Sequence, residues 1–314
     1  MAPGYPTSTT LVPLASVSHV TSVRVARALA LIVLAFWAFT IAVFAFTFLT
    51  ENAALQMRLA GLGSVALYLV CVAHAVLVRG ARPAIVFFGL TAVLAFTAEY
   101  LGDNYGLIFG SYHYTDALGP RLGGVPIIIV FAWGTVVYSA FAIVDWLANR
   151  SDGARGWGFR IAYALLVGLA TGLVTAAWDL MADPLSVSGV WEDVLGTQAW
   201  WWWVDGGPYL PDLQVWRGSA GIPVENFVGW VLVPATIVGL FSLLFPQPAR
   251  ITTRSLAAVP VLIYGFLYLT LAGGLIEMAW TDPGLEQALL VGTFTMGPVI
   301  AIGLLSVLAF TPER

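Results

Sequence analysis

The sequence contains no lysine, and all thirteen of its basic residues are arginine. Only 10% of the residues are charged and the formal net charge is -4, so there is no basic surface that could bind nucleic acid. The one cysteine, Cys71, lies in an apolar run, which excludes a disulfide framework and a cysteine-based metal site. With 60% hydrophobic residues and a mean hydropathy of +0.89, the composition also excludes a soluble globular enzyme and a disordered chain.

Long apolar runs dominate the sequence instead. A transmembrane helix needs about 20 mainly apolar residues, and eight runs meet that requirement. We therefore predict an all-α polytopic membrane protein with about eight transmembrane helices, built as a single membrane domain over residues 1–314. The predicted spans are 28–49, 59–78, 84–101, 125–147, 159–180, 226–245, 256–276 and 288–310.

The arginines predict the orientation in the cell membrane. In the eight-span arrangement ten of the thirteen fall on the side of the two termini, and only Arg58, Arg121 and Arg217 fall on the other side. Because short cytoplasmic loops are enriched in basic residues, both termini are expected to be cytoplasmic. The two long loops, 102–124 and 181–225, are then both outer loops, and they are rich in glycine, tyrosine and tryptophan.

The first acidic motif lies where the third span meets its outer loop. If helical geometry continues past Gly102, Glu99, Asp103, Gly106 and Gly110 share one helix face. That face would offer two carboxyls and room for a flat substrate. The alternative is that the glycines only allow close helix packing, but an ionisable group near the hydrocarbon, such as Glu99, is a functional candidate by default.

The second acidic motif ends the fifth span. Asp179 and Asp183 continue a stripe of small residues that includes Gly168 and Gly172, and Pro184 is expected to end the helix beside them. Two neighbouring carboxyls in a low dielectric resist double ionisation, so one of them should keep a proton and act as an acid. The alternative is a pair of solvated acids at a helix end.

Tryptophans are concentrated in the second outer loop, where Trp200 to Trp203 are consecutive and Trp230 follows. Such residues form belts at membrane interfaces, or they line a cavity in which their faces bind a polyene or stabilise a cation. The three histidines have no metal-binding spacing, so no metal is expected.

Three motifs occur in order between about residues 80 and 240. They are Glu99-x-x-Gly102-x-x-x-Gly106-x-x-Phe109-Gly110-x-Tyr112-x-Tyr114-Thr115 with Gly124-Val-Pro126 and Trp133; Asp179-x-x-x-Asp183-Pro184; and Gly206-Gly-Pro-Tyr209 with Gly221-Ile-Pro223-x-x-Asn226-Phe227-x-Gly229-Trp230. In this order they resemble the integral-membrane carotenoid hydratases of bacterial and haloarchaeal pathways, which include bisanhydrobacterioruberin hydratase. The sequence departs from that pattern at Asp103, where an uncharged residue is expected, and at Leu210–Ala220, which looks like an insertion.

The resemblance implies a carotenoid biosynthesis enzyme that adds water across the terminal 1,2 double bond of an acyclic carotenoid end group, without a cofactor or a metal. The carotenoid would arrive from the lipid phase through a groove along the glycine-lined faces of the third and fifth spans, and association with other membrane enzymes of the pathway is expected. We predict Asp179, Asp183 and Glu99 as catalytic carboxyls that converge on one pocket. The residues predicted to position substrate or water are Tyr112, Tyr114, Asn226, Trp133, Trp203, Trp230, Gly106 and Gly110.

Two other functions remain open from the residues alone. Asp179-x-x-x-Asp183 is also a spacing with which membrane prenyltransferases hold magnesium and a diphosphate, but the outer side has only three arginines to bind such an anion. A proton-coupled lipid transporter would use buried acids as proton relays, although the inverted repeats typical of transporters are not evident.

Overall fold

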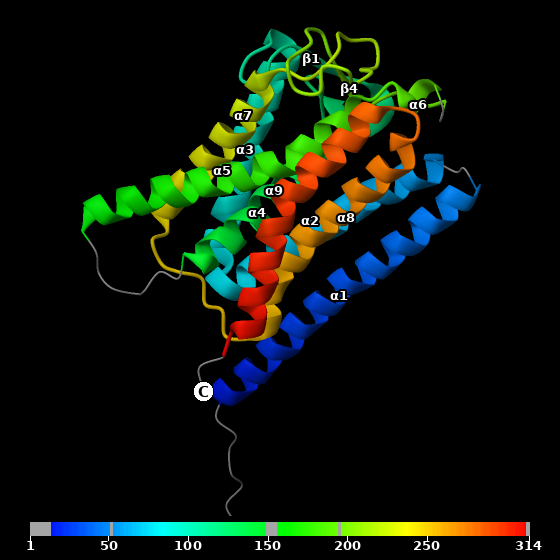
Figure 1. Cartoon of the computed structure of the whole chain (residues 1–314). Helices are drawn as coiled ribbons and strands as arrows, with labels where there is room; N and C mark the ends of the chain where they lie inside the picture. Colours follow the sequence, from blue (N-terminus) through cyan, green and yellow to red (C-terminus); the bar gives the residue numbers. More distant parts are fainter. Residues whose placement is uncertain (1–13, 51–52, 149–155, 194–195, 312–314) are drawn as a thin grey trace, which may run out of the picture.

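The computed structural model describes residues 14–50, 53–148, 156–193 and 196–311. Arg150, Arg155 and Arg314, which contribute to the predicted orientation, lie outside these residues. The start of the first helix and the end of the last one lie at the same end of the bundle (Figure 1). Which side of the membrane this end faces stays a prediction.

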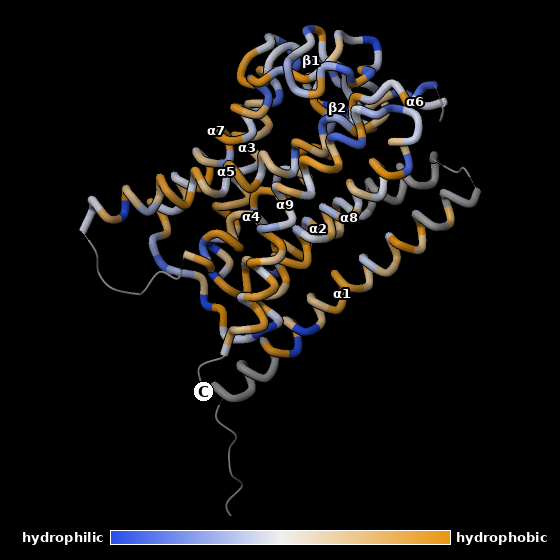
Figure 2. Tube along the Cα trace, viewed as in Figure 1, coloured by the Kyte–Doolittle hydropathy of each residue, from blue (hydrophilic) through white to orange (hydrophobic). Residues whose placement is uncertain are grey.

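Each of the eight predicted runs forms a helix, so the predicted all-α polytopic fold is confirmed. Seven of these helices in the described residues are long and apolar enough to cross a membrane, and α2 contributes a shorter apolar helix at Gly63–Arg79. Hydrophobic residues follow the helices, while hydrophilic residues gather towards the two ends of the bundle (Figure 2). The helices are α1 (Leu14–Thr50), α2 (Ala53–Arg79), α3 (Ala81–Tyr105), α4 (Ile127–Leu147), α5 (Trp157–Val187), α7 (Val224–Leu244), α8 (Arg254–Ala279) and α9 (Pro283–Ala309).

The small-residue seam of α5 packs directly on α7. A Cβ on Gly168 would lie 2.6 Å from the carbonyl oxygen of Ala235, and a Cβ on Gly172 would collide with the carbonyl oxygen of Val231. Only glycine lets the two backbones approach so closely. The prediction that this face of α5 forms part of a substrate groove is therefore wrong, because α7 fills it.

The two long loops join above one end of the bundle, where β1 (Tyr112–Tyr114) pairs antiparallel with β4 (Trp201–Trp203) (Figure 1). The register sets Tyr112 opposite Trp203 and Tyr114 opposite Trp201, so these four side chains share one face of the ribbon. The same layer holds a 3-10 turn at Asp116–Leu118, β2 (Arg121–Leu122) paired with β3 (Val125–Pro126), and the short α6 (Val190–Asp193).

Segment Leu210–Ala220, the expected insertion, packs into this layer. Leu213 is fully buried, the backbone N–H of Gln214 donates to Asp282 Oδ2 at the start of α9, and Trp216 Nε1 donates to Glu192 in α6. The segment therefore ties the loop layer to α6 and α9.

Helix α3 does not continue far enough to place all four residues of the first acidic motif on one face, and the predicted end of α5 at Pro184 is wrong. Helix α3 stops at Tyr105 because Gly106 adopts a left-handed conformation (φ 66°), so Gly106 and Gly110 do not continue the helix face of Glu99. Helix α5 continues through Pro184 to Val187. Proline lacks the N–H that would pair with the Leu180 carbonyl, and the Tyr209 hydroxyl donates to that oxygen instead (2.8 Å).

A second polar cluster lies at the opposite end of the bundle. The Arg79 guanidinium forms a buried ion pair with Asp145, which also accepts a hydrogen bond from the Tyr163 hydroxyl. Arg79 Nη1 donates to the Gln247 carbonyl in the segment between α7 and α8 (3.0 Å). This cluster joins α2, α4 and α5 to that segment.

Candidate active site

A small cavity of about 40 Å³ lies beneath the β1–β4 ribbon, and residues of α3, α4, α5 and α7 line it. It has room for only a few water-sized groups. Its walls combine three carboxyls and one amide with two tyrosines, five tryptophans and three apolar side chains. The lining residues are Glu99, Asp179, Asp183, Asn226, Tyr112, Tyr114, Trp133, Trp178, Trp201, Trp203, Trp230, Phe109, Ile129 and Ala132.

Glu99, in the last turns of α3, is 4% exposed and accepts hydrogen bonds from three side chains. Trp133 Nε1 donates to Oε1 (2.7 Å), and the hydroxyls of Tyr114 (2.8 Å) and Tyr112 both donate to Oε2. Burial, and after it the nearby Glu99 carboxyl, raises the pKa of both tyrosines well above the ordinary value of 10. Their hydroxyls therefore stay protonated and remain donors to Glu99.

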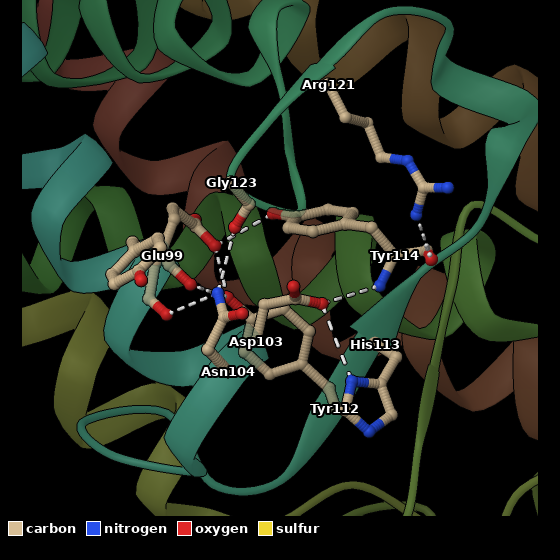
Figure 3. A network of polar contacts seen from close by, with 9 residues as sticks. Glu99, Asp103, Asn104, Tyr112, His113, Tyr114, Arg121 and Gly123 are labelled. Atoms are coloured by element: carbon tan, nitrogen blue, oxygen red, sulfur yellow. Dashed lines mark hydrogen bonds and ion pairs between the residues drawn. The ribbon is translucent and has the colours of Figure 1, made fainter.

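The hydroxyls of Tyr112 and Tyr114 reach Glu99 because another residue of α3 forms a hydrogen bond to the backbone of β1, the strand that carries both tyrosines (Figure 3). Asp103 lies one turn after Glu99, and its Oδ1 accepts a hydrogen bond from the backbone N–H of Tyr114 (3.1 Å) and lies 3.6 Å from His113 Nδ1. Arg121 Nη1 donates to the Tyr114 carbonyl (3.1 Å). Asp103 therefore fixes β1 against α3. This contact is a structural reason for an aspartate at a position where an uncharged residue was expected.

Asp179 and Asp183 lie side by side on α5 and share one donor. Asn226, in the first turn of α7, donates from Nδ2 to Asp179 Oδ2 (2.6 Å) and to Asp183 Oδ2 (2.8 Å). Asp183 Oδ1 accepts two more hydrogen bonds, from Trp201 Nε1 (2.7 Å) and Trp203 Nε1 (3.1 Å). All three polar side chains are almost completely buried, at 2%, 1% and 3% exposure for Asp179, Asp183 and Asn226.

The two aspartates have different hydrogen-bond environments. Three N–H groups point at Asp183, so its oxygens act as acceptors, as those of an ionised carboxylate do. Within the described residues Asp179 accepts only from Asn226, and its Oδ1 has no protein hydrogen-bond partner. Asp179 is therefore the carboxyl with an oxygen left to carry a proton.

Aromatic faces make up much of the remaining wall. Trp133 of α4 and Trp230 of α7 stack in parallel, with ring centroids 4.1 Å apart and 4° between their planes. Trp178 tilts against Trp230 (5.3 Å, 54°), and Phe109 contacts both stacked rings. The negative π faces of such rings stabilise a positive charge in their vicinity.

A family model described as carotenoid biosynthesis protein matches residues 55–297. The chain belongs to the carotenoid biosynthesis protein family. The match includes all four helices that enclose the cavity and both loops that cover it. No curated protein and no solved structure matches the chain.

The cavity of this carotenoid biosynthesis protein brings together most of the predicted site residues. Glu99, both aspartates, both tyrosines, Asn226 and the three predicted tryptophans all line it, which is the predicted convergence of three carboxyls. Gly106 and Gly110 do not line the cavity. A Cβ on Gly106 would meet the Ser111 side chain, and one on Gly110 would lie 3.6 Å from Pro223 and Trp203.

The predicted site residues do not include Trp178 and Trp201, although cavity lining was one of the two interpretations of the run that contains Trp201. Trp201 could have been found, because side chains two residues apart in a strand share a face and Trp203 was already a candidate. Trp178 precedes Asp179 on a helix and gave no comparable signal. Among the residues that the structure describes, no group of three or more His, Cys, Asp or Glu is arranged to hold a metal ion.

Proposed function

We propose that this carotenoid biosynthesis protein is a hydratase that adds water across the terminal 1,2 double bond of an acyclic carotenoid end group. The observation that carries the proposal is the cavity beneath the β1–β4 ribbon, which Glu99, Asp179 and Asp183 line together with five tryptophans. A carbon–carbon double bond is a weak base, so its protonation needs a carboxylic acid in an apolar pocket. The product is a tertiary alcohol.

In the proposed reaction, Asp179 donates its proton to the less substituted alkene carbon, and the π electrons form the new C–H bond. The positive charge then rests on the tertiary carbon, where the tryptophan faces and the Asp183 carboxylate stabilise it. A water molecule forms the C–O bond and passes one proton to Glu99, which Tyr112 and Tyr114 hold in place. Before the next turnover Glu99 gives up the proton it took from the water and Asp179 regains one, so the net reaction is alkene plus water to alcohol.

We propose that the substrate reaches the cavity from the lipid phase, because a carotenoid is nearly insoluble in water. The cavity of about 40 Å³ is far too small for a whole carotenoid, so the polyene has to extend away from it. This size favours chemistry at the chain end over chemistry at the centre of the polyene. We also propose, from the sequence alone, that the protein associates with other membrane enzymes of the pathway.

The prenyltransferase alternative finds less support. The Asp183 oxygens face N–H donors from Trp201, Trp203 and Asn226, which leave little space for a cation. Arg121 directs its guanidinium to Asp116 and to the Tyr114 carbonyl. A diphosphate would require arginine or lysine at the cavity, and none lines it.

The test is expression in a bacterial strain that accumulates an acyclic carotenoid, with mass analysis of the pigments. We expect products heavier by one water for each end group that reacts. Asp205→Asn, which changes an exposed acid outside the cavity, should give the same products as the native protein. Unaltered pigments at a verified protein level would overturn the proposed function.

A further inference from the structure

We propose that the indole N–H of Trp178 binds the reacting oxygen, first as water and then as the hydroxyl of the tertiary alcohol. This inference rests on the proposed hydratase function and adds a water-positioning residue to it. Trp178 lies in α5 directly before Asp179 and lines the cavity. Its Nε1 is buried, and no residue in the described part of the chain accepts a hydrogen bond from it.

Three of the other four tryptophans that line the cavity give their indole N–H to a protein acceptor. Trp133 donates to Glu99, and Trp201 and Trp203 both donate to Asp183. A buried N–H without an acceptor costs free energy, so native proteins pair such groups with protein, water or ligand. Trp178 Nε1 therefore calls for an acceptor that comes from outside the chain.

The chemistry of the indole restricts what that acceptor is. Indole nitrogen is a donor only, so its ligand must present a lone pair. A hydrocarbon polyene has none, whereas water and a tertiary alcohol each have an oxygen lone pair. Of the reactants in the proposed hydration, only the water and the product hydroxyl can bind Trp178 Nε1.

The contact is compatible with the attack of water. One lone pair of the water oxygen accepts the Trp178 hydrogen bond, and the other forms the C–O bond to the tertiary carbon. The O–H bond that breaks gives its proton to Glu99, while Asp179 has already supplied the proton of the new C–H bond. The Trp178 hydrogen bond keeps the oxygen in place throughout and gains or loses no proton.

The chain contains a matched control. Trp200 also has a buried Nε1 without a hydrogen-bond partner among the described residues, but it does not line the cavity. Its ring lies beside Trp191, with centroids 5.9 Å apart. Trp200→Phe therefore removes the same kind of unpaired N–H at a place where no water is expected to react.

The test compares Trp178→Phe with Trp200→Phe and the native protein, all reconstituted in lipid with an acyclic carotenoid. Loss of one hydrogen bond should lower the turnover number of Trp178→Phe by about fivefold to tenfold and weaken binding of the alcohol product by a similar factor. The KM for the alkene should stay unchanged, because the alkene has no acceptor. Trp200→Phe should match the native protein in all three measurements.

Two results would overturn the inference while leaving the hydratase function in place. One is native turnover and product affinity in Trp178→Phe. The other is an equal loss of alkene and alcohol binding, which would show that the ring matters only as packing. Absence of any alcohol from the native protein would overturn the proposed function itself, and this inference with it.

A second measurement does not depend on the folding of a variant. In native protein with nitrogen-labelled tryptophan, the indole N–H resonance of Trp178 should shift when the alcohol product is added and should not shift with the alkene. The Trp200 resonance should not respond to either compound. Identical responses of Trp178 to alcohol and alkene would contradict a hydrogen bond to the hydroxyl.

Discussion

Replacing Asp179 and Asp183 one at a time by asparagine should have different consequences, although the two side chains lie side by side. Asn226 Nδ2 donates to Oδ2 of both residues, at 2.6 and 2.8 Å. An asparagine at position 179 keeps an oxygen that can accept this hydrogen bond, and its NH₂ group occupies the place of Oδ1, which has no partner among the described residues. Asp179→Asn should therefore change the free energy of unfolding by less than about 1 kcal/mol.

The same substitution removes the proposed proton donor. General acid catalysis contributes about 10²- to 10⁴-fold to a rate, so the turnover number of Asp179→Asn should fall by a factor in this range. Because the shape of the side chain hardly changes, the KM for the carotenoid should change little. Such a pattern indicates an interaction that is made in the transition state and not in the ground state.

Asp183→Asn should lose stability as well. Both oxygens of Asp183 accept N–H groups, so an amide NH₂ must face either Trp201 and Trp203 or Asn226. Each arrangement sets donor against donor in a buried place, which costs about 1–3 kcal/mol for every group left unpaired. We expect a lower unfolding temperature in detergent together with reduced turnover.

The assay measures alcohol formation in lipid vesicles and thermal unfolding in detergent, at equal protein amounts, for native protein and both variants. Turnover of Asp179→Asn within about threefold of the native rate would refute the assignment of the proton donor, since general acid catalysis contributes at least about 10²-fold. Equal unfolding temperatures for the two variants would refute the argument from the three donors on Asp183.

Three further predictions concern other parts of the molecule. Tyr114→Phe removes one O–H donor to Glu99 and should lower turnover by about fivefold to tenfold; a native rate would show that this donor is dispensable. Gly172→Val places a Cβ against the carbonyl oxygen of Val231 and should destabilise the protein by about 1–3 kcal/mol, measured by thermal unfolding, with an unchanged melting temperature as the contrary result. Arg79→Met leaves Asp145 buried without its cation and should cost about 3–5 kcal/mol, so a native unfolding temperature would contradict a buried ion pair.

The helices could be predicted from the sequence because their signal is local. A run of about 20 apolar residues is sufficient evidence for a membrane helix, and all eight runs form helices. The pairing of β1 with β4 joins segments almost 90 residues apart, and three-residue strands within loops carry no pattern of comparable strength. The observed ends of α3 and α5 depend on conformational or distant effects: the left-handed Gly106, and Tyr209, which compensates for the missing N–H of Pro184.

The carboxyls of the site were predictable for a different reason. A charged group in a membrane helix is costly, so Glu99 and Asp179 were candidates by their position alone. The hydrogen-bond donors to these carboxyls were harder to predict from the sequence, because hydrogen bonds such as that from Trp201 to Asp183 form only when the two loops fold together. The prediction of a substrate groove along the glycine-lined face of α5 was wrong, because the sequence shows that a small-residue face exists but not which helix packs on it.

The most direct test of the proposed hydration is an assay with purified protein in lipid vesicles, an acyclic carotenoid and isotopically labelled water. We expect a tertiary alcohol whose oxygen comes from the water, formed without any added cofactor and lost in Asp179→Asn. An unchanged carotenoid, or an alcohol whose oxygen does not come from water, would contradict it.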